Sequence, residues 1–159
     1  MVVLQEIPVN HTLQRLADHL QLDAEVHDRL RLTFGHACAL RVRHLLEQQP
    51  VIDCLDGLGR YLDAGAHRSS VERLAAEAAG LARRHEGSRS INGCEHAAAS
   101  ATCAVAQALA GKPLVAAAYA AYASVYAQGG YGAVAVADPE SFQPEFVWQV
   151  GCLSALAGA

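Results

Sequence analysis

Charged residues are scarce in the second half of this chain. Eleven of the twelve Lys and Arg residues and twelve of the sixteen Asp and Glu residues lie before residue 90. The net charge is −4 and the basic residues are interleaved with acidic ones, so the chain has no basic surface for nucleic acid. We therefore expect no nucleic-acid partner. The uncharged half should fill the centre of the fold or meet another protein.

Long, strongly apolar runs are also missing. No uncharged stretch of about eighteen residues is hydrophobic enough to cross a bilayer, because alanine is only weakly apolar. The first eight residues contain no basic residue and already include Glu6 and Pro8, which is unlike a secretory signal. We expect a cytoplasmic protein with no membrane partner.

The cysteines do not form the even, closely spaced set of a disulfide framework. There are five of them, widely spaced and mostly within apolar helical patterns. Thiols in such contexts pack as small apolar side chains. We expect reduced core residues at Cys38, Cys54, Cys94, Cys103 and Cys152.

Motifs for metal binding and catalysis are absent as well. The eight histidines include no pair four residues apart, and no glutamate is followed by a histidine at the spacing of a di-iron bundle. Residues 130–135 match the letters of a dinucleotide fingerprint, but they follow an alanine-rich helical pattern instead of a strand. We predict no cofactor, no metal and no enzymatic activity. A cryptic helical enzyme built on Cys94 and His96 is the less favoured alternative.

What the chain has in abundance is alanine, concentrated over 92–128 and interrupted only at Gly111-Lys112-Pro113. Glycine marks a helix end and proline a helix start, so the pattern predicts helices over 92–110 and 113–128. Alanine has the highest helix propensity, and its short side chain lets helices pack closely. With so little charge, this αα-hairpin should lie at the centre of the fold.

Apolar residues at helical spacing predict five further helices, over 10–20, 24–48, 50–64, 70–86 and 144–157. Asn10, Asp23 and Ser69 are the expected N-caps, and Gly65 ends the third helix. Residues 129–143 should form the one long loop, with a single short candidate strand at 133–136. We therefore predict an all-α fold: one domain over 1–159, a bundle of about seven helices around the alanine-rich central hairpin.

Two sets of side chains could form a contact surface. Asp53, Asp56, Arg60 and Asp63 fall on one side of the predicted third helix, because they recur at helical spacing. Tyr119, Tyr122 and Tyr126 form a stripe on the second alanine-rich helix, which we interpret as core in preference to an exposed aromatic surface. The single tryptophan, Trp148, should be mostly buried against the hairpin.

Three short motifs occur in order between residues 34 and 156. Cys38, Ala39, Arg41 and Val42 fit Trp-Ala-x-x-Cys-Ala-x-Arg-Val, with Phe34 in the place of tryptophan. Arg60 and Gly65 fit an Arg-x-Trp-x-x-Gly helix end, with Leu62 in the place of tryptophan. The last motif, Glu-x-x-Trp-Gln-x3-Leu-x-x-Leu, is matched by Glu145, Trp148, Gln149, Leu153 and Leu156. In these motifs the chain resembles immunity protein family five, the alanine-rich helical antidotes of bacterial polymorphic toxin systems.

The resemblance implies a non-enzymatic immunity protein that binds a cognate toxin and neutralises it by protein–protein contact. An acidic surface would suit a toxin with a positive active-site cleft, so we expect the toxin to contact Asp53, Asp56, Arg60 and Asp63, with Tyr131 as an aromatic anchor. The resemblance gives a structural role to Cys38, Arg41, Gly65, Trp148 and Gln149. The alternative is a helical scaffold or regulatory protein that forms a homodimer.

Overall fold

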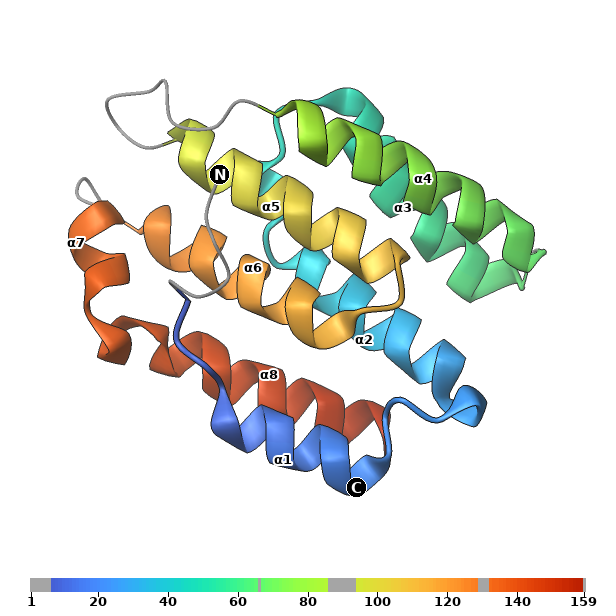
Figure 1. Cartoon of the computed structure of the whole chain (residues 1–159), viewed down its shortest axis with the longest axis horizontal. Helices are drawn as coiled ribbons and strands as arrows, with labels where there is room; N and C mark the ends of the chain where they lie inside the picture. The colour runs from blue at the N-terminus through green and yellow to red at the C-terminus, as the bar shows by residue number, and fades with distance from the viewer. Residues whose placement is uncertain (1–6, 66, 86–93, 129–131, 159) are drawn as a thin grey trace.

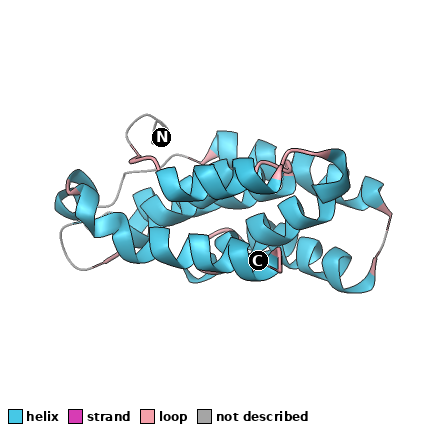
Figure 2. Ribbon diagram, turned by 90° about the horizontal axis from the view of Figure 1, so that it is seen from below, coloured by secondary structure: helices cyan, strands magenta, loops and turns pink. Residues whose placement is uncertain are grey.

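The computed structural model describes residues 7–65, 67–85, 94–128 and 132–158, and in this part of the chain every regular element is helical (Figures 1 and 2). The all-α prediction is confirmed. Three 3₁₀ turns span Glu25–His27, Arg43–Leu45 and Pro139–Phe142. The α-helices are α1 (His11–Leu20), α2 (Asp28–Leu40), α3 (Gln49–Ala64), α4 (Arg68–Arg84), α5 (Cys94–Leu109), α6 (Pro113–Tyr126), α7 (Gly132–Ala137) and α8 (Gln143–Leu156).

Several helix ends follow the local sequence signals. Asn10 caps α1, where its side chain accepts a hydrogen bond from the backbone N–H of Leu13 at 3.2 Å. Pro113 begins α6. Gly65 ends α3 in the left-handed conformation, with φ of 68°, which glycine adopts without steric cost.

The helix predicted over 24–48 is wrong as a single element. It is divided into a 3₁₀ turn, α2 and a second 3₁₀ turn, and no side chain caps α2, so Asp23 has no capping role. The guanidinium of Arg31 donates hydrogen bonds to the carbonyl oxygens of Leu22 and Ala24. These bonds fix the chain before α2 in a turn, a tertiary effect that helical spacing does not reveal.

Two other local expectations also fail. The 129–143 segment contains α7 and a 3₁₀ turn, and the candidate strand at 133–136 lies within α7, where alanine favours the helix. Helix α4 begins at Arg68 without a side-chain cap, so Ser69 is inside the helix. The predicted start of the first alanine-rich helix, at Asn92, lies outside the described residues.

The α5–α6 hairpin occupies the middle of the molecule, as its composition predicts (Figure 1). Helices α3 and α4 lie on the α5 side of the hairpin, and α8 and α1 lie on the α6 side. Helix α2 lies behind the hairpin and packs against both α5 and α6. Seen edge-on, the helices form two layers (Figure 2). Larger side chains from the surrounding helices, such as Phe34, Leu55 and Phe142, are fully buried around the alanines.

The backbones of α2 and α5 approach each other closely at Gly35 of α2. A Cβ atom placed there would lie 3.1 Å from both Cα and Cβ of Ala108 on α5, closer than ordinary van der Waals contact. The backbone of α5 cannot rotate away as a long side chain could. Glycine on α2 and alanine on α5 therefore set the distance between these helices.

We predict that Gly35→Ala lowers the free energy of unfolding by about 1–3 kcal/mol, because the added methyl group overpacks this contact and outweighs the gain in helix propensity. The control is Gly151→Ala on α8, where nothing lies within 4 Å of the added atom. That variant should raise stability by about 0.5–1 kcal/mol. Urea denaturation of both proteins checks the pair, and equal stabilisation at the two sites would contradict it.

Candidate functional site

The acidic side of α3 is one continuous surface, since the helix runs without interruption from Gln49 to Ala64. Asp53, Arg60 and Asp63 are exposed there. Asp56 is partly covered, with 37% of its side chain exposed. The proposed anchor Tyr131 lies outside the described residues.

Asp56 is already paired within the protein. Arg43 donates to both of its carboxylate oxygens, from Nε at 3.1 Å and from Nη2 at 2.8 Å. This hydrogen bonding lowers the pKa of Asp56. Among the described residues, the side chain of Asp53 accepts a hydrogen bond only from a neutral donor, Nε2 of Gln49 at 2.8 Å. The charges left for a partner are therefore those of Asp53, Arg60 and Asp63.

His36 of α2 lies against α3 directly beneath this surface. Its Nε2 is 3.1 Å from the position that a Cβ atom of Gly59 would occupy, so the absence of a side chain at Gly59 makes room for the ring. Burial lowers the pKa of His36, although the carboxylates of Asp63 and Asp56 act in the opposite direction. The folded protein therefore favours the neutral imidazole.

We predict that stability falls as the pH is lowered from 7.5 towards 5. The unfolded chain binds a proton at His36 near its ordinary pKa of 6.5, whereas the folded protein binds it only at lower pH. Unfolding therefore takes up protons in this window, and stability increases with pH. Thermal unfolding of His36→Gln should show a weaker pH dependence than the wild type. The control is His19→Gln, which removes an imidazole at an exposed position. If His36→Gln and the wild type show the same dependence of stability on pH, His36 is not the group responsible.

A second cluster lies where α2, α6 and α8 meet. Arg41, at the end of α2, donates to both carboxylate oxygens of Glu145 on α8, from Nε at 2.9 Å and from Nη2 at 2.7 Å. The hydroxyl of Ser124 on α6 donates to the same carboxylate at 3.1 Å. The guanidinium carbon of Arg41 is 4.2 Å from the centroid of the Trp148 ring. Glu145 is buried, whereas 35% of the Arg41 side chain remains exposed.

The expectation for Trp148 is met in part. Its side chain has intermediate exposure and packs against the core, but the guanidinium of Arg41 lies over its ring. The reason is the position of α8, which packs more extensively on α2 and α1 than on the hairpin. A tryptophan facing a cation gains a cation–π interaction that an apolar alanine surface does not provide.

The motif residues occupy two places in the fold. Gly65 ends α3, while Cys38, Arg41, Trp148 and Gln149 lie along α2 and α8. The Gln149 side chain is buried, donates to the carbonyl oxygen of Ala117 at 2.9 Å and accepts from Asn10 at 3.1 Å. The pairing of Glu145 with Arg41 and Ser124 was missed by sequence reasoning. Arg41 and Glu145 each belong to one of the three sequence motifs, but no local pattern shows that their side chains are in contact.

We predict that Arg41→Met lowers the free energy of unfolding by about 2–4 kcal/mol, because it leaves the Glu145 carboxylate buried without its partner. The double variant Arg41→Met with Glu145→Met should be within about 1 kcal/mol of the wild type, since apolar replacement of both partners removes the unpaired charge. Chemical denaturation measures both. Additive losses in the double variant would contradict this account.

Four of the five thiols lie in the described part of the chain, and burial governs their pKa. Burial raises the pKa of Cys38, Cys103 and Cys152, and it raises the pKa of Cys54 to about 11. All four are free thiols, as expected. The side chain of Cys94 lies outside the described part. The ring of His96 stacks on Tyr126, with 4.8 Å between the centroids.

The predicted tyrosine stripe is largely core. Tyr119 and Tyr122 are buried, with 9% and 5% of their surfaces exposed, and only Tyr126 is partly exposed. A contact surface that needed all three rings to be accessible would require α6 to leave the bundle. The core interpretation of the helical spacing is therefore correct for Tyr119 and Tyr122.

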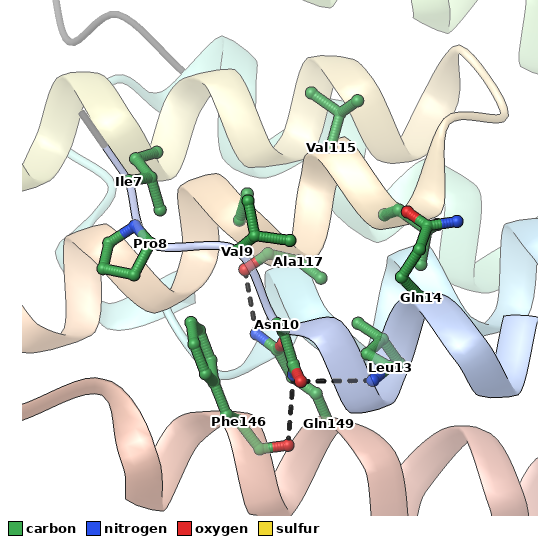
Figure 3. A pocket seen from close by; sticks show the side chains of 12 residues that line it. Ile7, Pro8, Val9, Asn10, Leu13, Gln14, Val115, Ala117, Phe146 and Gln149 are labelled. Atoms are coloured by element: carbon green, nitrogen blue, oxygen red, sulfur yellow. Dashed lines mark hydrogen bonds between the residues drawn. The ribbon is translucent and has the colours of Figure 1, made fainter. Parts of the chain in front are cut away.

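A hollow of about 330 Å³ lies between the N-terminal segment, α1, α6 and α8 (Figure 3). Its lining contains no charged residue, and most of the lining side chains are apolar. The side-chain amides of Asn10 and Gln149 are hydrogen-bonded to each other. Asn10 also bonds to the Leu13 N–H and the Phe146 carbonyl oxygen, and Gln149 to the Ala117 carbonyl oxygen (Figure 3). Polar groups here hold the helices together and leave little to orient a ligand.

Within the described ranges, no three His, Cys, Asp or Glu side chains gather closely enough to hold a metal ion. None of the helices in that part of the chain is both long and apolar enough to cross a membrane. Comparisons with family models, curated proteins and solved structures find no match to this chain.

Proposed function

We propose that this protein is a non-enzymatic immunity protein that binds a cognate toxin and neutralises it by contact. The motifs between residues 34 and 156 and their resemblance to immunity protein family five support this function. The observation that carries the contact surface is the exposure of Asp53 and Asp63 on α3. Both carboxylates stand on a rigid helix and neither forms an ion pair among the described residues.

An acidic helix suits a toxin that acts on an anionic substrate. Such a toxin has a positive cleft, and carboxylates placed in it block the substrate and accelerate association. Asp56 contributes less than its position in the sequence indicates, because Arg43 already neutralises it. The surface that would enter the cleft is therefore centred on Asp53 and Asp63, with Arg60 between them.

We predict that Asp53→Lys with Asp63→Lys slows association with the toxin and weakens its inhibition without unfolding the protein, because both side chains are exposed. The probe is the product of the neighbouring gene, with association rates measured at low and high salt. The difference between variant and wild type should shrink as salt screens the charges. The matched control is Asp23→Lys with Glu25→Lys, which makes the same charge change at exposed positions before α2.

Equal slowing by both double variants would show that net charge matters and that the α3 surface does not. If the wild-type protein forms no complex with the neighbouring product, the immunity function is wrong. In that case a mass of twice the monomer in solution would favour the homodimeric scaffold.

A further inference from the structure

The Arg41–Trp148 cluster has features that stabilisation of the fold does not require. A buried ion pair costs desolvation energy, and apolar residues of similar size usually serve stability as well. Here the pair holds the guanidinium over the tryptophan ring, with its carbon atom 4.2 Å from the ring centroid, while a third of the arginine side chain stays exposed. Leu40, the preceding residue, is also exposed, at 44%. The result is a cation fixed over an aromatic ring, with an exposed apolar residue next to it in the chain.

The hydrogen-bonding capacity of this surface is only partly used. A guanidinium has five N–H groups, and Glu145 accepts two of those of Arg41. The remaining ones have no partner among the described residues. Because Glu145 already compensates the charge of Arg41, a second carboxylate would be repelled at this site. A neutral acceptor, such as a main-chain carbonyl oxygen, would not.

We infer that Arg41, Trp148 and Leu40 form a second contact surface for the toxin, one that receives main-chain carbonyl oxygens from a loop of the toxin together with an apolar side chain. This inference rests on the proposed function and adds to the acidic contact on α3. Arginine and tryptophan are the residue types that most often dominate interface energies. Glu145 and Ser124 are positioning residues, and they reduce the entropy lost on binding because the arginine is ordered beforehand.

The first experiment uses the wild-type sequence with 5-fluorotryptophan at position 148, the single tryptophan, and the unlabelled product of the neighbouring gene. The one ¹⁹F resonance should shift on complex formation. Its change in frequency between H₂O and D₂O should also decrease, since the toxin covers the exposed part of the ring. An unchanged resonance in a complex that forms normally would overturn this inference and leave the proposed function intact.

The second experiment measures the affinity of Arg41→Met with Glu145→Met, which removes the guanidinium without leaving a lone buried carboxylate. The dissociation constant should rise about 30-fold or more. The control is Arg68→Met with Asp28→Met, which removes a more exposed arginine–carboxylate pair between α4 and α2, together with the contact of Asp28 to Arg31. That control should bind like the wild type, and equal losses in both double variants would overturn the inference.

Salt dependence tests the chemistry of the partner group. With a neutral carbonyl acceptor, the affinities of the wild type and of the Arg41→Met, Glu145→Met protein should fall in parallel as salt increases. A shallower dependence in the variant would mean that the toxin presents a carboxylate, and would overturn the assignment of a carbonyl. Failure of the wild-type protein to bind at all would count against the proposed function, and this inference would fall with it.

Discussion

The fold depends on the short distance between the backbones of α2, α5 and α6. Most of the buried residues of the central hairpin are alanine, and at Gly35 the backbone of α2 meets Ala108 of α5 with no side chain of α2 between them. Helices this close gain many dispersion contacts per residue but leave no room for larger groups. Bulky core residues lie around this contact: Phe34, Leu55 and Phe142 come from the surrounding elements, and Tyr119 and Tyr122 come from α6 itself.

Several arginine side chains form hydrogen bonds and ion pairs between the outer helices. Arg29 donates to the carbonyl oxygen of Leu62 near the end of α3, and Arg31 donates to carbonyl oxygens before α2. Arg68 pairs with Asp28 between α4 and α2. Much of the charge in the first half of the chain thus satisfies backbone acceptors and carboxylates within the fold. Only the remainder, including Asp53 and Asp63, is free for electrostatic contact with a partner.

The two surfaces that we propose for toxin binding are connected through the end of α2. Arg41 and Arg43 are two residues apart at the end of α2, and they pair in different directions, with Glu145 on α8 and Asp56 on α3. The bidentate geometry of each pair limits the movement of these helices relative to α2. A partner that contacts both surfaces would therefore meet a rigid arrangement and would lose little entropy in ordering it.

The sequence by itself determined the helical class, the central hairpin and several helix ends, because alanine content, Asn10, Pro113 and Gly65 act through local backbone preferences. It also placed the carboxylates on one side of α3, since helical spacing is local. Only the tertiary structure decided that Arg43 pairs with Asp56 and that Arg41 pairs with Glu145 across the bundle. It also decided that α2 begins after a turn, which hydrogen bonds from Arg31 hold in place. These contacts join residues whose proximity arises from helix packing, and a long side chain can reach any of several partners. The helical periodicity of one segment therefore does not predict which residue of another segment its side chains will pair with.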